Sequence, residues 1–134
     1  MVADTARAGA PAYRVLETSH PPTYYLPRSS FLEGSLRPAS GTSFCEWKGR
    51  AEYLDLVAVA VTGEVVAPKA GWFYPAPTPS FSVITDHVAV MPGQVDACWY
   101  DDERVTPQEG GFYGGWITSR VVGPFKGSPG TWHW

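Results

Sequence analysis

The clearest hydrophobic pattern in the chain runs from residue 42 to residue 61. Its first half alternates between apolar and charged positions, as in an extended strand whose successive side chains point to opposite faces. One face holds Cys45, Trp47, Gly49, Ala51 and Tyr53. The other face holds Glu46, Lys48, Arg50 and Glu52. Residues 54–61 are almost entirely apolar, so we predict one central strand over 42–61 that ends buried.

Shorter patterns predict further strands and turns on both sides of this segment. The predicted strands cover residues 13–18, 23–26, 65–67, 88–91, 95–100 and 116–118. The predicted turns lie at Thr62-Gly63-Glu64, Pro92-Gly93 and Asp101-Asp102. These turn residues adopt the backbone conformations that hairpins need. The pattern therefore favours antiparallel pairing between neighbours in the chain, including a hairpin of 88–91 with 95–100.

Two other segments are predicted to be something other than strands. Residues 36–41 are polar and predict a loop. Residues 69–79 (KAGWFYPAPTP) interleave three prolines with three aromatic residues. Because proline cannot donate to a strand ladder, we predict a rigid segment that covers the core or walls a pocket. One short helix is predicted over 79–86, since Thr78 suits an N-cap and Pro79 a first helical turn.

The composition agrees with a mainly β fold. The chain has 134 residues, which suits one domain, and hydrophobic residues make up 44% of it. Only 17% of the residues are charged, whereas Gly 14 and Pro 13 are abundant. Glycine and proline interrupt helices and favour turns. We predict a flexible tail over residues 1–12 and a single β domain over 13–134.

Charge and cysteine content exclude several classes of protein. A net charge of -3 argues against nucleic-acid binding, which favours basic surfaces. The run at 54–61 is far shorter than the roughly 20 residues of a membrane span, and the N-terminus lacks the apolar core of a signal peptide. We therefore expect no membrane partner and a cytoplasmic protein. Cys45 and Cys98 show no metal-binding spacing, so we expect reduced, mostly buried thiols, no metal and no cofactor.

Three segments resemble a known family. They are residues 17–28 (ETSHPPTYYLPR), 42–53 (TSFCEWKGRAEY) and 72–77 (WFYPAP). Their order and spacing are similar to the hallmark segments of the domain-of-unknown-function family 427 (DUF427), and residues 84–91 resemble the segment that follows. The resemblance covers about residues 13–108. The glycine-rich tail is similar to one branch of the family.

The resemblance implies a fold more than an activity. It implies small, coiled antiparallel sheets of the Mss4-like or β-tent type around a groove. Members of that wider group often hold zinc with four cysteines, but this chain has two. The family is sometimes labelled nucleotidyltransferase-like. That chemistry uses a Gly-Ser turn followed by closely spaced aspartates, and no Asp-x-Asp follows Gly34-Ser35.

Two residues are candidates for acid–base catalysis. His20 precedes two prolines that hold its backbone extended, and its ordinary pKa suits proton transfer near neutral pH. Glu17 lies just before it and would complete an acid–base pair if the two side chains converge. The alternative is that His20 only hydrogen-bonds within its loop.

A second group of residues is predicted to bind a ligand. The members are Tyr24, Arg28, Cys45, Lys48, Trp72 and Tyr74. Aromatic residues beside prolines often line pockets, and the basic residues would meet an anionic group. Four of them also have a purely structural alternative: Cys45 as a buried thiol, Lys48 as part of a solvated charged face, and Trp72 and Tyr74 as packing over the core.

Three functions remain open at this stage. The favoured hypothesis is a small-molecule-binding domain with an aromatic pocket, whose ligand is unknown. The alternative is a small enzyme that uses the His20 and Glu17 pair, with Lys48 or Arg28 stabilising negative charge. The family label implies nucleotidyltransferase-like chemistry as one form of this alternative. The third is a protein–protein adaptor, which needs an exposed apolar patch. The sequence leaves the oligomeric state open, a homodimer included.

Overall fold

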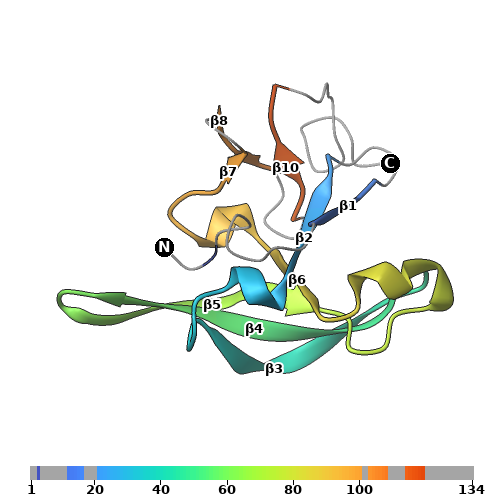
Figure 1. Ribbon diagram of the computed structural model, residues 1–134, viewed down its shortest axis with the longest axis horizontal. Helices are drawn as coiled ribbons and strands as arrows, with labels where there is room; N and C mark the ends of the chain where they lie inside the picture. Colours follow the sequence, from blue (N-terminus) through green and yellow to red (C-terminus); the bar gives the residue numbers. More distant parts are fainter. Residues whose placement is uncertain (1–2, 4–11, 17–20, 101–102, 109–113, 120–134) are drawn as a thin grey trace.

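In the residues that the structure describes, six antiparallel strands form one curled sheet in the order β1-β2-β6-β5-β4-β3 (Figure 1). This computed structural model describes residues 3, 12–16, 21–100, 103–108 and 114–119. The sheet consists of β1 (Tyr13–Val15), β2 (Thr23–Pro27), β3 (Leu36–Cys45), β4 (Gly49–Ala60), β5 (Gly63–Phe73) and β6 (His87–Val90). Two small sheets pair β7 (Trp99–Tyr100) with β8 (Glu103–Arg104) and β9 (Thr106–Pro107) with β10 (Trp116–Ile117).

Helical structure in the described ranges is confined to short 3-10 turns. They are η2 (Arg28–Ser30), η3 (Pro79–Ile84) and η4 (Pro92–Gln94). The mainly β prediction is therefore confirmed, and η3 is the short helix predicted near residues 79–86. Thr78 precedes η3, but its hydroxyl makes no cap bond to that helix. None of the helices formed by the described residues is long and apolar enough to cross a membrane.

The prediction of one central strand over 42–61 was wrong, because a turn at residues 46–48 divides it into β3 and β4. Gly49 closes this turn with a φ of +106°, a conformation that favours glycine. The hairpin pairs Cys45 with Gly49, so alternation continues in phase across the turn. The turn residues depart from the pattern: Trp47 is 72% exposed, whereas Lys48 is only 6% exposed.

The prediction for the segment 69–79 was wrong for residues 69–73. Residues up to Phe73 belong to β5, which lies between β4 and β6 in the sheet. The three prolines of the segment begin at Pro75, after β5 has ended. They therefore remove no hydrogen bond from the pairing of residues 69–73. Residues 36–41, predicted as a loop, belong to β3, whose pairing with β4 is irregular between Pro38 and Thr42.

The pairing of β6 differs from the predicted hairpin of 88–91 with 95–100. β6 pairs with β2 and β5 inside the sheet. β7 instead pairs with β8, on the two sides of the predicted turn at 101–102, which lies outside the described residues. Of the predicted N-terminal tail, Ala3 pairs with Phe31 in an isolated bridge and packs against the hydrophobic core. Most other residues of that tail lie outside the described ranges.

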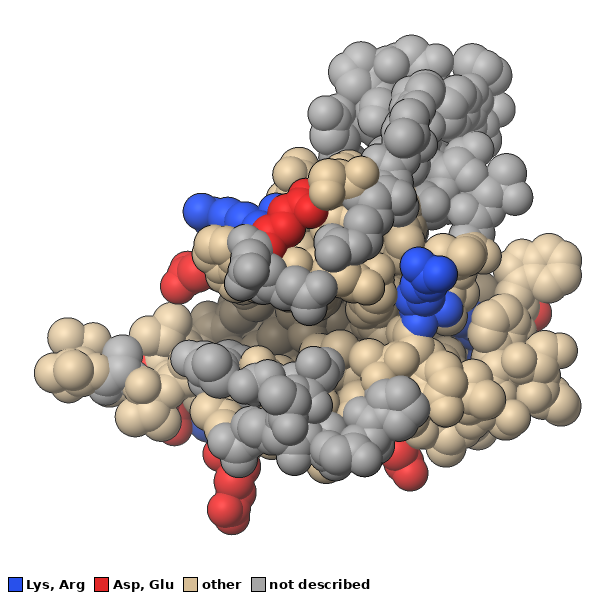
Figure 2. Space-filling view, turned by 45° about the horizontal axis from the view of Figure 1, so that its top comes forward, with Lys and Arg blue, Asp and Glu red and all other residues tan. Residues whose placement is uncertain are grey.

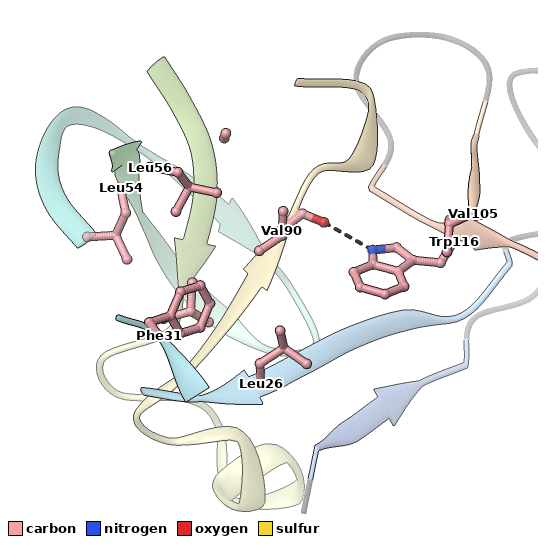
Figure 3. Close-up of a cluster of buried hydrophobic side chains, with 9 residues drawn as sticks. Leu26, Phe31, Leu54, Leu56, Val90, Val105 and Trp116 are labelled. Atoms are coloured by element: carbon pink, nitrogen blue, oxygen red, sulfur yellow. Dashed lines mark hydrogen bonds between the residues drawn. The ribbon is translucent and has the colours of Figure 1, made fainter. Parts of the chain in front are cut away.

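Two hydrophobic cores lie on opposite faces of the sheet. The main core consists of Leu26, Phe31, Leu54, Leu56, Ala70, Val88, Val90, Val105 and Trp116 (Figure 3). The second core consists of Tyr25, Ala51, Tyr74, Ile84 and Ala89. Neighbours in one strand alternate between them, as Leu26 and Tyr25 do in β2, because successive side chains point to opposite faces. The family-like segments therefore contribute to both faces of the sheet.

Candidate functional site

The turn between β3 and β4 is held against the segment that follows β5. The backbone N–H of Thr78 donates to the carbonyl oxygen of Lys48 at 3.0 Å, and the Thr78 hydroxyl donates to that of Trp47. A Cβ on Gly49 would lie 3.3 Å from the carbonyl oxygen of Ala76, so the two backbones approach closely. These contacts fix the position from which the Lys48 side chain starts.

Lys48 is buried among aromatic rings. Its Nζ lies 5.9 Å from the ring centroid of Tyr74 and 5.8 Å from that of Phe81. An ammonium group over an aromatic face is attracted by the ring quadrupole, by about 0.5–2 kcal/mol. The sequence predicted Lys48 on the solvated face of a strand, whereas the turn directs it to the second core.

Several of the predicted ligand-binding residues pack against the second core, which the Lys48 side chain also reaches at Tyr74. Cys45 and Trp72 are half-buried and pack against the second core, of which Tyr74 is a member. The strand pattern had placed Cys45 and Lys48 on opposite faces, but the turn between them brings both to this core. Gly114 covers one side of Trp72, since a Cβ there would lie 2.2 Å from the indole.

Two residues at this site were not among those predicted from the sequence. Tyr25 is buried, and its ring centroid lies 6.3 Å from that of Tyr74. Phe81 of η3 is half-buried against the same core. The alternation of Tyr24 and Tyr25 in β2 was the available signal, because only one of the two can face Trp72. We use the name Lys48 cluster for Tyr25, Cys45, Lys48, Trp72, Tyr74 and Phe81.

Tyr24 and Arg28 lie on the other face of the sheet. The Tyr24 ring centroid is 5.1 Å from that of Trp116 and 5.5 Å from that of Tyr100. Burial raises the pKa of the Tyr24 hydroxyl, and the neighbouring Tyr100 raises it further. The Arg28 guanidinium lies 4.5 Å from the centroid of the Phe73 ring, which packs against the main core. The structure therefore separates these two residues from Lys48, Trp72 and Tyr74.

His20 and Glu17 lie outside the described residues, so their predicted acid–base role stays a prediction. The residues that flank them in the chain are described. Val15 packs against the second core. Pro21 lies so close to Gly115 that a Cβ on this glycine would be 2.4 Å from the proline ring.

Cysteine and metal chemistry in the described part of the chain is limited. Both Cys45 and Cys98 are free thiols. Burial raises the pKa of the Cys98 thiol to about 11, which disfavours the reactive thiolate. The described residues form no group of three or more His, Cys, Asp or Glu side chains that could hold a metal ion.

Comparison with known proteins relates the chain to one family. A family model described as "Domain of unknown function (DUF427)" matches residues 1–101. The match includes every residue of the Lys48 cluster and excludes β8, β9 and β10. No curated protein matches the chain in sequence.

Proposed function

The chain belongs to the DUF427 family, and from the arrangement of its hallmark segments around one buried lysine we propose that it is a small-molecule-binding β domain. Its ligand would bind at the Lys48 cluster. The favoured ligand is a small acid: an anionic group for Lys48, attached to a planar or apolar body for the surrounding rings.

The position of Lys48 is the observation that carries this proposal. Lysine is rarely buried, because desolvation of an ammonium group is costly. Here the side chain is only 6% exposed, on a turn whose backbone Thr78 holds in place. A buried ammonium group interacts more strongly with an anion than a solvated one does, because the local dielectric constant is lower.

The neighbours of Lys48 support an aromatic or apolar ligand body. Trp72, Phe81 and Cys45 are half-buried, so this side of the cluster is partly accessible to solvent. Binding sites of this kind are mostly apolar, with a few fixed polar groups that orient the ligand. Tyr25 and Tyr74 add hydroxyl groups to the same cluster and are themselves buried.

Calorimetric titration of the purified protein with a set of aromatic carboxylates, and with the matching uncharged amides, tests the proposal. We expect at least one carboxylate to bind more tightly than its amide. Lys48→Met should weaken that binding by at least about tenfold, since a charge-assisted hydrogen bond is lost.

Lys69→Met is the matched control for this experiment. The Lys69 Nζ also lies 5.9 Å from a tyrosine ring, that of Tyr53, but Lys69 is exposed and outside the Lys48 cluster. Its substitution should leave the affinity unchanged. The proposal fails if none of the acids binds, or if the two lysine variants lose affinity equally.

An acid–base enzyme that uses His20 and Glu17 is the second candidate, since the ordinary pKa of a histidine suits proton transfer near neutral pH. In that case a bound acid would be a substrate, and His20 would transfer a proton. His20→Gln should then lower the rate of turnover without weakening binding. Equal binding in both proteins, with no turnover of any bound acid, would favour the binding domain over the enzyme.

A further inference from the structure

The hairpin of β4 and β5 extends beyond the rest of the sheet as an apolar arm. We use the name hairpin arm for residues 57–67. Figure 1 shows its end projecting away from the other strands on the left. The valines exposed on it are Val59, Val61, Val65 and Val66, with exposed fractions of 88%, 107%, 54% and 40%. An exposed apolar group of this kind is typical of an interaction surface.

The backbone edges of the hairpin arm have no neighbouring strand within the described chain. On the β4 side, the pairing with β3 ends where Leu36 meets Leu56, and one further bond joins the Val57 N–H to the carbonyl oxygen of Ser35 at 2.8 Å. On the β5 side, the pairing with β6 is restricted to Gly71 and Trp72. Among the described residues, the β5 edge over 63–67 therefore pairs with no strand other than β4, and a free edge of this kind readily pairs with another strand.

Charges that would prevent such pairing are almost absent from the hairpin arm. Glu64 is the only charged residue between Leu56 and Pro68 in the sequence. It forms an exposed ion pair with Arg37 at 3.2 Å. Figure 2 shows the outermost end of the arm, on the left, mostly in the tan of uncharged residues. Free edges are usually protected by lysine, proline or inward-pointing charges, whereas residues 63–67 carry only Glu64 as a charged side chain.

We propose that the hairpin arm is the interface of a homodimer. The free β5 edges of two copies pair antiparallel about a two-fold axis near Val65 and join the two sheets. Antiparallel pairing of a segment with itself is symmetric, so one edge serves both copies. Pro68 lacks an N–H and ends the pairing on one side, and the turn at residues 61–62 ends it on the other. A second copy offers the same valine-rich edge.

Sedimentation equilibrium of the full chain over a range of concentrations tests this inference. We expect the wild type to show a monomer–dimer equilibrium. Val65→Lys should weaken the dimer by at least about tenfold, since it places two ammonium groups near each other across the axis. Val83→Lys is the matched control: Val83 has the same exposed fraction, 54%, but lies on η3 away from the arm. This variant should dimerise like the wild type.

Two results would overturn the proposal. One is a wild type that stays monomeric at all concentrations, and the other is equal dimerisation of the two lysine variants. If Val65→Lys does not fold, hydrogen exchange of the wild type replaces it. The amides of residues 63–67 should then become more protected as the protein concentration rises, and protection independent of concentration would refute the dimer. This inference does not depend on the Lys48 cluster, so it stands or fails separately from the proposed function.

Discussion

Gly114 lies against the indole of Trp72 with no room for a side chain between them. A Cβ on Gly114 would lie 2.2 Å from Cη2 of Trp72, well below any normal contact distance. Trp72 belongs to the segment matched by the family model, whereas Gly114 lies after residue 101, where that match ends. A residue beyond the part of the chain that the family model matches therefore packs against Trp72 of the Lys48 cluster.

We predict that Gly114→Ala destabilises the protein. Either the backbone or the Trp72 ring must move, and overpacking of this kind costs roughly 1–3 kcal/mol. Urea unfolding followed by fluorescence measures the free energy of unfolding. Gly93→Ala is the control, because its Cβ would lie 3.6 Å from Pro107, an ordinary contact. Equal stability of the two variants would contradict the prediction.

A second prediction concerns the hydrogen bond that joins β10 to β6 within the main core. The Trp116 indole N–H of β10 donates to the carbonyl oxygen of Val90 in β6 at 3.1 Å (Figure 3). Trp116→Phe keeps a ring but leaves this buried carbonyl without its donor, which costs about 1–3 kcal/mol. Trp99→Phe, at a side chain that is 58% exposed, should change the free energy of unfolding by less than about 0.5 kcal/mol. A Trp116→Phe protein as stable as this control would show that the bond contributes little.

The raised pKa of Cys98 predicts a loss of stability at alkaline pH. Below the ordinary thiol value of 9.0, the folded and unfolded states both keep the proton. Between 9.0 and about 11 the unfolded chain releases it while the folded protein retains it. The free energy of unfolding must therefore fall as pH rises through this window.

Comparison with Cys98→Ala isolates this contribution from other groups that titrate at high pH. The advantage in unfolding free energy of the wild type over the variant should shrink as pH rises from about 8 to about 11. Urea unfolding at several pH values measures it. A constant difference would mean that burial of the thiol does not shift its pKa.

Local patterns in the sequence predicted the fold class and most strands, but not the turn that creates the candidate site. A turn over residues 46–48 leaves the apolar positions of Cys45 and Ala51 in phase, so a hairpin and one long strand share the same alternation. Gly49 was the available signal, since its positive φ closes the turn. Trp47, predicted to be in the core, is exposed, and Lys48, predicted to be solvated, is buried. The reason is that residues in a turn do not follow the two-residue period of a strand.

Long-range pairing explains the remaining differences between prediction and structure. Alternation in β2 predicts that Tyr24 and Tyr25 face opposite sides, but not which side holds Trp72. That choice depends on β6 lying between β2 and β5, an order that no neighbouring residues specify. The contact of Tyr24 with Trp116 likewise joins strands far apart in the chain. The sequence could thus suggest the residue types of a site, but not their grouping.

Thr78 provides a final prediction that links the turn to the proposed binding site. Its hydroxyl donates to the carbonyl of Trp47 while its backbone N–H donates to that of Lys48. Thr78→Val removes only the first bond at nearly constant volume, so we expect a loss of roughly 0.5–1.5 kcal/mol in the free energy of unfolding. The proposed function adds a second effect: a less rigid turn should bind the aromatic acid more weakly, because ordering the turn then costs part of the binding free energy.

The matched control for Thr78→Val is Thr106→Val, at an exposed position of β9. It should change neither stability nor affinity. Unfolding curves and calorimetric titrations of the same two proteins separate the two effects. Lower stability with unchanged affinity would show that the Thr78 hydroxyl holds the fold but not the ligand-binding geometry. Lower stability together with weaker binding would show that the turn must be held in place for the ligand to bind well. Thr78 would then affect affinity through the position of Lys48, without contacting the ligand itself.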